Sequence, residues 1–139
     1  MEDSFRNKLW YLAHPYTADS EHQIELNVKN ANVIAAKLIC AGLFVYSPIS
    51  MTHWIHKEAV NMGLIDNSEW QLWMKFDFFF IENHCIGLIL SPGWENSPGC
   101  IEEYRRFKEL QKPIYKLEEV FQELGIKKQM LYNDRRNYE

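Results

Sequence analysis

The chain has 139 residues, of which 47% are hydrophobic and 14% aromatic, and this composition excludes a protein that is disordered throughout. We expect one domain over residues 1–139, with a core at about 9–125 and a polar C-terminal tail at 126–139. The net charge of −4 argues against a partner that is a nucleic-acid polymer, because proteins that bind such polymers are usually basic.

The cysteines and the N-terminal residues indicate the cellular setting. Cys40, Cys85 and Cys100 form no CxxC pair and are too few and too scattered for a disulfide framework. They favour a reducing compartment, in which thiols serve as small core residues. The opening residues lack the pattern of a signal peptide, and no apolar run approaches the roughly 18 residues of a membrane span. We therefore expect a cytoplasmic protein with no membrane partner.

The first half of the chain alternates short apolar runs with a longer helical pattern. Leu9–Ala13 (LWYLA) predicts a first strand. Apolar residues spaced by three and four predict a helix over about residues 20–41, and Gly42 is well placed to end it. Leu43–Ser47 (LFVYS) predicts a second strand. The range 48–67 gives no clear pattern beyond a short helix before its glycine.

The second half continues the alternation. Helices are predicted at about residues 68–84, 98–110 and 117–124, with a strand at 86–90 and a short apolar pair at 114–115. Asn67 and Ser68 are both suitable caps for the first of these helices. Strands separated by helices of this length are typical of right-handed βαβ crossovers. We therefore predict an α/β fold, a three-layer Rossmann- or flavodoxin-like doubly wound parallel sheet of about four to five strands.

In such a sheet, ligands bind beyond the carboxyl ends of the strands, which gathers the loops at 13–18, 47–56 and 91–99. Two neighbouring acids follow the last loop. Glu103 shares a helix face with Phe107, which predicts that it points inward. Glu102 has Arg105 and Arg106 three and four residues later, which indicates an exposed, ion-paired face. Acids in a first helical turn are also common simply because they complement the helix dipole, so a structural role stays open.

Asp77 is a third candidate acid. It lies on an otherwise apolar stripe of its predicted helix, between Met74 and Ile81. Burying an acid costs free energy unless it is paired or hydrogen-bonded. Asp77 is therefore either a cleft residue or a boundary residue that touches solvent.

The segment NSPG opens the predicted helix at 98–110. Ser97 is a suitable cap, Pro98 suits the first helical position, and the N–H groups around Gly99 are free to hold a phosphate. The same residues are equally an ordinary helix start, because the segment matches neither the GxxxxGK[ST] nor the GxGxxG pattern.

The histidines do not form a recognisable metal site. His53 and His56 make an HxxH pair, but no third ligand stands at a suitable spacing, so we expect neither a metal nor a cofactor. His14 follows the first strand, where it contacts either a ligand or only its neighbours.

Four stretches, in this order and spacing, resemble one known family. They are YLAHPYT, AAKLICAGLFVYSPI, the pair Trp73 and Asp77, and SPGWENSPGCIEE. Together they resemble the nucleoside 2-deoxyribosyltransferase-like superfamily, over about residues 9–115. That superfamily includes the transferases, the 2′-deoxynucleoside 5′-monophosphate N-glycosidases and many uncharacterised bacterial and phage members, and the loop containing Gly-Trp is closest to the last group.

The resemblance implies roles for particular residues. Glu103, four residues after Gly99, matches the family's nucleophile, Asp77 matches its second catalytic acid, and Tyr11 matches the tyrosine of its first strand. The transferases tend to carry an aspartate where this chain has Ser97, whereas the monophosphate glycosidases tend to carry a serine that contacts the 5′-phosphate. Ser97 therefore favours a nucleotide substrate.

Further substrate-binding residues are implied less directly. They are His14, Tyr16, His53 and Trp94, with Tyr16, Trp94 or Phe76 stacking on the base. The chain departs from the family at His14-Pro15-Tyr16, where a glycine-containing turn is common, and at Cys85, where an aspartate is common. The family usually forms oligomers, so we expect a homodimer or larger, with the end of the chain either completing a neighbour's site or forming a disordered tail.

The resemblance implies cleavage of the N-glycosidic bond of a (2′-deoxy)nucleoside 5′-monophosphate, through a glutamate nucleophile and a glycosyl-enzyme. A carboxylate suits this reaction because the transition state resembles an oxocarbenium ion, which a nearby anion stabilises and captures. Two alternatives stay open. One is a nucleoside 2-deoxyribosyltransferase that exchanges bases, and the other is a non-catalytic nucleotide-binding or sensing module.

Overall fold

The computed structural model of the chain describes residues 6–127, so most of the predicted tail at 126–139 lies outside the described part. Four strands form one sheet in which every neighbouring pair is parallel, in the order β2-β1-β3-β4. The strands are β1 (Leu9–Ala13), β2 (Phe44–Tyr46), β3 (Cys85–Leu90) and β4 (Ile114–Lys116). The predicted α/β fold, of the Rossmann- or flavodoxin-like kind, is confirmed.

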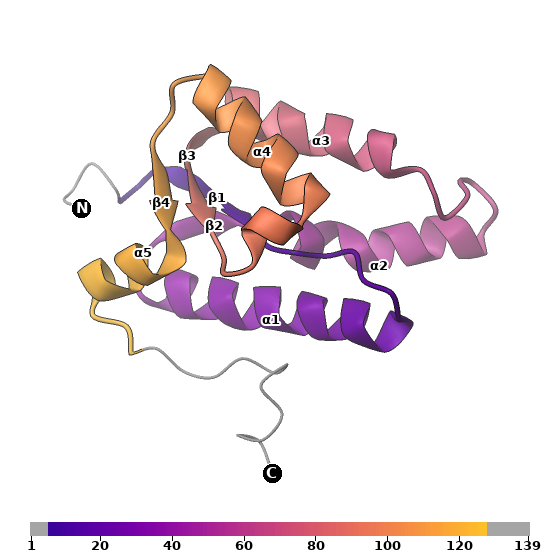
Figure 1. The fold of residues 1–139 in the computed structure, drawn as a ribbon, viewed down its shortest axis with the longest axis horizontal. Helices are drawn as coiled ribbons and strands as arrows, with labels where there is room; N and C mark the ends of the chain where they lie inside the picture. The colour runs from indigo at the N-terminus through magenta and orange to yellow at the C-terminus, as the bar shows by residue number, and fades with distance from the viewer. Residues whose placement is uncertain (1–5, 128–139) are drawn as a thin grey trace, which may run out of the picture.

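Helices cover both faces of the sheet (Figure 1). They are α1 (Glu21–Cys40), α2 (Pro48–Asn61), α3 (Trp70–Asn83), α4 (Pro98–Glu109) and α5 (Leu117–Leu124), with a 3-10 turn, η1, at Trp94–Asn96. Helices α1 and α5 pack on one face and α3 and α4 on the other, while α2 lies against α1. No helix among residues 6–127 is long and apolar enough to cross a membrane.

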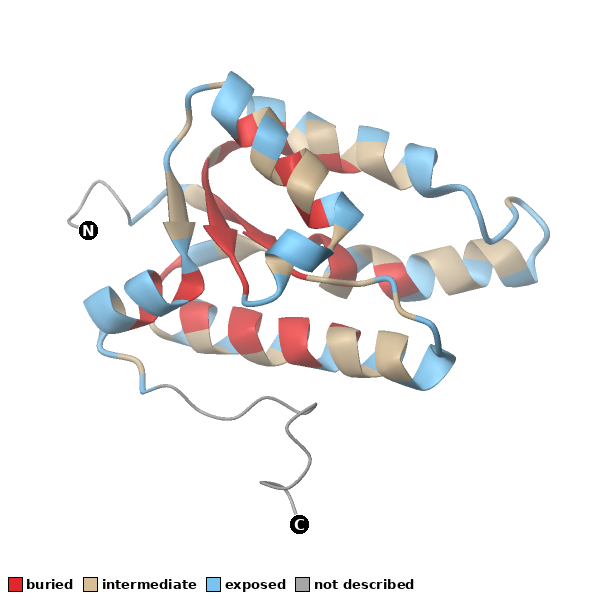
Figure 2. Ribbon diagram, in the orientation of Figure 1, coloured by how far each residue is buried: buried red, intermediate tan, exposed pale blue. Residues whose placement is uncertain are grey.

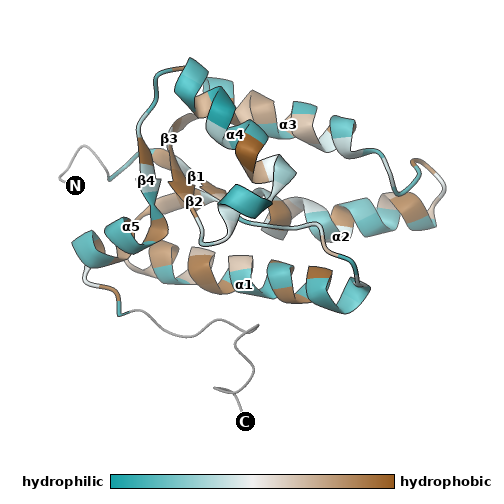
Figure 3. Ribbon diagram, viewed as in Figure 1, coloured by the Kyte–Doolittle hydropathy of each residue, from teal (hydrophilic) through white to brown (hydrophobic). Residues whose placement is uncertain are grey.

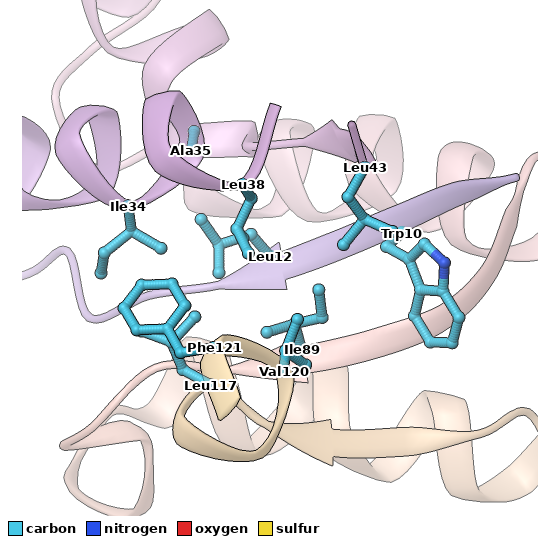
Figure 4. Close-up of a cluster of buried hydrophobic side chains, with 10 residues drawn as sticks. All are labelled: Trp10, Leu12, Ile34, Ala35, Leu38, Leu43, Ile89, Leu117, Val120 and Phe121. Atoms are coloured by element: carbon cyan, nitrogen blue, oxygen red, sulfur yellow. The ribbon is translucent and has the colours of Figure 1, made fainter. Parts of the chain in front are cut away.

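The alternation of β1 divides the core into two layers, which Figure 2 shows as buried segments on both sides of the sheet. Trp10 and Leu12 point toward α1 and α5, where they join the cluster drawn in Figure 4. Tyr11 and Ala13 point toward α3 and α4. Figure 3 shows the central strands as hydrophobic and much of α4 as hydrophilic. The second layer is therefore the one into which a largely polar helix inserts.

Helix α2 is the main departure from the predicted elements. The sequence predicted only a short helix before Gly63, whereas α2 has 14 residues. Pro48 stands at its first position, where the fixed φ of proline suits a helix and its missing N–H is not needed. The pattern is obscured because Trp54 and Ile55 lie exposed, which blurs the amphipathic periodicity on which the prediction depended.

The start of α3 also differs from the prediction, because neither of the two expected caps is used. Glu69 occupies the cap position without a side-chain hydrogen bond. The backbone N–H and the hydroxyl of Ser68 both donate to Asp66 Oδ1, at 2.9 and 2.6 Å. Asn67 Oδ1 instead lies 3.0 Å from His56 Nε2. The polar side chains of the turn before α3 therefore hydrogen-bond within the turn or to α2, and none of them caps the helix.

Gly87 in β3 is the position where a side chain would disturb the sheet most directly. A Cβ atom there would lie 2.3 Å from Cζ3 of the Trp10 ring and 2.7 Å from the carbonyl oxygen of Pro113. The indole of Trp10 thus packs over the backbone of β3, and the carbonyl group of Pro113, just before β4, lies close to the same glycine.

We predict that Gly87→Ala lowers the free energy of unfolding by about 1–3 kcal/mol, because the core must shift to admit one methyl group. Urea denaturation followed by Trp fluorescence measures the loss. Gly99→Ala is the matched control, since a Cβ atom at Gly99 meets nothing within 4 Å. Equal stability of the two variants would contradict the close packing of Trp10 on β3.

Candidate active site

Two tyrosines stand side by side on neighbouring strands. Tyr11 of β1 and Tyr46 of β2 are register partners, and both face the layer of α3 and α4. Their ring centroids are 5.7 Å apart. Tyr46 also stacks on Phe80 of α3, with centroids 4.3 Å apart and rings 17° from parallel. The sheet therefore presents two hydroxyl groups to the same place.

Two carboxyl groups accept hydrogen bonds from these hydroxyls. Tyr11 donates a hydrogen bond to Glu103 Oε2 of α4. Tyr46 donates one to Asp77 Oδ1 of α3, at 3.3 Å. Asp77 and Glu103, the acid pair, are each only 7% exposed. The structure thus brings together the three residues for which catalytic roles were predicted, Tyr11, Asp77 and Glu103, and adds Tyr46 to them.

The start of α4 fixes the direction of Glu103. Ser97 caps the helix by accepting a hydrogen bond from the N–H of Cys100 at 3.3 Å, and Pro98 follows at the first helical position, as predicted. Cys100, Glu103 and Phe107 are the buried residues of this helix, three and four positions apart. Their spacing makes one inward stripe, so Glu103 points toward the sheet.

Glu102 faces the opposite way, and the predicted difference between the two glutamates is confirmed. Its carboxylate pairs with Arg105, and its side chain is 46% exposed. The sequence also offered Arg106 as a partner, but Arg106 pairs with Glu109 and reaches across to Glu82 of α3. Arg106 is therefore a link between α3 and α4.

Burial governs the acidity of the acid pair. Loss of solvent raises the pKa of Glu103 to about 8, with a smaller contribution from the nearby charge of Asp77, while the Tyr11 hydrogen bond acts in the opposite direction. Burial likewise raises the pKa of Asp77 to about 7, against the hydrogen bonds of Tyr46 and Tyr11. Two acids that interact in this way titrate as a coupled pair, so the pair retains a proton at neutral pH.

Tyr16 and His53 form a separate polar pair. The Tyr16 hydroxyl lies 2.8 Å from His53 Nδ1, and the Tyr16 carbonyl accepts from Asn27 Nδ2 at 3.0 Å. The Tyr16 ring packs on the contact between α1 and α2. Within the described residues neither has a hydrogen bond to the acid pair, so their substrate-binding roles stay predictions.

His14 is buried at the carboxyl end of β1, and burial lowers its pKa to about 4, so its imidazole is neutral at physiological pH. Its Nδ1 atom has no hydrogen-bond partner among the described residues. The loop that follows lies against the loop after β3, because the N–H of Ser91 donates to Ala13 at 3.0 Å. The predicted convergence of these two loops is thereby confirmed, whereas a ligand contact for His14 stays a prediction.

The loop before α4 is open to solvent, in contrast to the acid pair. Gly99 is exposed and Ser97 is half-buried. The Trp94 ring packs at a tilt of 31° against Tyr104, with ring centroids 4.8 Å apart. Phe76 on α3 packs edge-on against its aromatic neighbours Trp73 and Phe80. The helix start is therefore accessible to an anion, and Glu103 lies one helical turn beyond it.

The surface groove along α3 lies apart from the acid pair. A surface groove of about 530 Å³ runs along α3, and its lining includes Trp70, Phe78 and Glu102 but neither member of the pair. Among residues 6–127 no group of three or more His, Cys, Asp or Glu side chains is arranged to hold a metal ion. His56, one half of the HxxH pair, accepts from Trp73 Nε1 at 2.9 Å. That bond gives His56 a structural role between α2 and α3.

A family model described as a domain of unknown function (DUF1937) matches residues 8–119, and the chain belongs to this family. The match spans every residue of the candidate site from Tyr11 to Glu103. No curated protein matches the chain. The family assigns no activity, so the relationship to the nucleoside 2-deoxyribosyltransferase-like superfamily stays a prediction from the sequence.

The raised pKa of Glu103 predicts a stability that depends on pH. Folding raises this pKa from an ordinary value of 4.5 to about 8, so the folded state holds a proton that the unfolded chain releases. The free energy of unfolding therefore falls as pH rises between these two values. Glu103→Gln removes this term, and we expect its stability relative to wild type to rise by about 3–4 kcal/mol between pH 5 and pH 8.

Urea unfolding at several pH values measures the effect. Glu102→Gln, a substitution of the exposed neighbour, is the matched control and should follow the wild-type slope. A Glu103→Gln profile that runs parallel to wild type across this range would show that Glu103 is not perturbed.

Proposed function

We propose that this member of the family cleaves the N-glycosidic bond of a nucleoside 5′-monophosphate, and that Glu103 is the nucleophile. One observation carries the proposal: the buried Tyr11–Glu103 hydrogen bond beside a second buried acid, Asp77. Such an arrangement holds the Glu103 carboxyl group in a fixed direction and keeps one proton on the pair near neutral pH. Because the pKa of Glu103, about 8, is above that of Asp77, about 7, the reacting form is the minor one in which Asp77 carries that proton. Glycosidases require this combination of a nucleophile and an acid.

The reaction proceeds in two steps. Glu103, ionised, attacks the anomeric carbon as the bond to the base breaks, while Asp77 gives its proton to a nitrogen of the leaving base. Water then attacks the same carbon and loses a proton to Asp77, which releases the sugar and restores Glu103 as a carboxylate. Tyr11 holds Oε2 of Glu103 throughout.

The 5′-phosphate is assigned to the start of α4. The first N–H groups of a helix have no carbonyl partner within it, and the helix dipole adds partial positive charge there. The N–H of Cys100 is taken by the Ser97 cap, whereas Gly99 is exposed. The amide of Gly99 and the hydroxyl of Ser97 are therefore the groups offered to a phosphate.

One observation favours a second candidate, transfer of the sugar to another base. Because each member of the acid pair is only 7% exposed, a glycosyl-enzyme on Glu103 would be shielded from water. A shielded intermediate lives longer and can be intercepted by an incoming base. The nucleophile and the acid keep the same roles in this reaction.

We predict that the wild-type protein releases free base from a nucleoside 5′-monophosphate, measured by chromatography over a panel of nucleosides and monophosphates. Glu103→Gln should lower kcat by roughly 10³-fold or more, because a neutral amide cannot capture the anomeric carbon. Glu102→Gln, with its exposed and ion-paired side chain, should retain activity. Release that persists unchanged in Glu103→Gln would overturn the assignment, and release only when a second base is supplied would identify a transferase.

Ser97→Ala tests the phosphate site. We expect kcat/KM for the monophosphate to fall about tenfold or more, with little change for the unphosphorylated nucleoside, because only the former uses the hydroxyl. The variant also loses a helix cap, and Ser20→Ala is the matched control. Ser20 caps α1 by accepting from the N–H of Gln23 at 3.1 Å, away from the acid pair. Equal losses for both substrates would contradict a phosphate contact at Ser97.

A further inference from the structure

Tyr46 is the member of the cluster for which neither the sequence nor the family gives a role. It ends the short edge strand β2, and its hydroxyl reaches Asp77 Oδ1 on α3 at 3.3 Å. Its ring is held from two sides, by the stacking on Phe80 and by the tilted contact with Tyr11. The hydroxyl therefore has a fixed position that does not depend on Asp77.

The hydrogen bond distinguishes the two oxygens of Asp77. A phenol has one proton to donate, and Tyr46 directs it to Oδ1. When Asp77 is protonated, the proton is therefore favoured on Oδ2, the atom left without that donor. When Asp77 has lost its proton, the same hydrogen bond is charge-assisted and stronger. Tyr46 thus affects both where the proton sits and how readily it leaves.

We propose that Tyr46 is a positioning residue for the acid Asp77, an inference that rests on the proposed function. Tyr46 orients Asp77 so that Oδ2 gives the proton to the leaving base. It also stabilises the Asp77 carboxylate that results. The proton moves from Asp77 Oδ2 to a nitrogen of the base as the bond between that nitrogen and the anomeric carbon breaks. Asp77 takes a proton back from water in the second step, so Tyr46 serves both halves of the cycle.

The groups that act on Asp77 come from each element packed around it. They are Tyr46 of β2, Tyr11 of β1 and Glu103 of α4, and Cys85 of β3 interacts with Tyr46. Hydrogen bonds from both tyrosines lower the pKa of Asp77, against the larger effect of burial. None of these groups is a cation. The two hydroxyls are therefore the main features that stabilise an ionised carboxyl group here.

The two tyrosines then differ in their effect on the pH dependence of the reaction. The reaction needs Glu103 ionised, so activity is lost at low pH as Glu103 gains a proton. It also needs Asp77 protonated, so activity is lost at high pH as Asp77 loses its proton. Removing a donor from a carboxylate raises its pKa. Tyr46→Phe should therefore move the alkaline limb alone to higher pH, whereas Tyr11→Phe removes a donor from both acids and should move both limbs to higher pH.

The first experiment needs no substrate. NMR titration of the full chain, with ¹³C-labelled carboxyl groups, should show the pKa of Asp77 rising by about one pH unit in Tyr46→Phe. The ring of Phe can keep the stacking on Phe80, so the change removes only the hydroxyl. Tyr115→Phe in β4 is the matched control and should leave Asp77 unchanged. An unchanged titration of Asp77 in Tyr46→Phe overturns the inference, whatever the protein is found to catalyse.

The second experiment compares leaving groups. A nucleotide with a purine methylated at N7 already carries the positive charge on its base, which departs without a proton. Tyr46→Phe should lower kcat about ten- to a hundredfold for the ordinary nucleotide and little for the methylated one. Equal losses for both substrates would show that Tyr46 only supports the packing. If wild type releases no base from any substrate, the proposed function fails, while the titration still decides whether Tyr46 sets the proton of Asp77.

Discussion

Burial of two carboxyl groups against one sheet is the constraint on which the rest of this structure depends. A carboxyl group removed from water favours its protonated form, and a second one nearby strengthens that preference. Asp77 and Glu103 come from different helices, and the tyrosines that meet them come from different strands. The arrangement therefore exists only when β1, β2, α3 and α4 are all in place, which makes it a property of the whole fold.

The contacts around this cluster keep the two acid-bearing helices in place. Lys112 donates from Nζ to the carbonyl oxygens of Ile81 and Cys85, at 2.5 and 2.8 Å, and so fixes the end of α3 where the chain turns into β3. On the surface, Arg106 of α4 pairs with Glu82 of α3. An exposed ion pair contributes little to stability, so the partly buried lysine contacts and the packing of α3 on the sheet carry more of the constraint.

The sequence predicts the parts of this site that depend on position within one element. The α/β architecture follows from the alternation of apolar runs and helical patterns, and helix geometry alone separates Glu103 from Glu102. Ser97 and Pro98 likewise predict the start of α4, because helix capping depends only on residues that are close in the sequence. These features can be predicted without knowing which elements pack against each other in the fold.

The sequence does not predict features that depend on register or on neighbouring elements. The role of Tyr46 follows from its pairing with Tyr11 across two strands, and a three-residue strand carries too little pattern to set that register. The pairing of Tyr16 with His53 joins a loop to the middle of a helix that the sequence did not reveal. The sequence could have marked only His53, because a histidine on the buried side of a helix is unusual. That pattern does not indicate Tyr16 as its partner.

The choice of tyrosine as the partner of each acid has a chemical consequence. An arginine or lysine in either place would hold its acid ionised through neutral pH, because an adjacent cation lowers the pKa of a carboxyl group. A pair with both members ionised could attack a sugar but could not protonate a leaving base. A phenol stabilises the carboxylate by a hydrogen bond and adds no charge, so burial still keeps one proton on the pair. In the proposed reaction, two neutral donors would thus allow one acid to act as nucleophile while the other carries a proton, which is a reason for Tyr46 to accompany Tyr11.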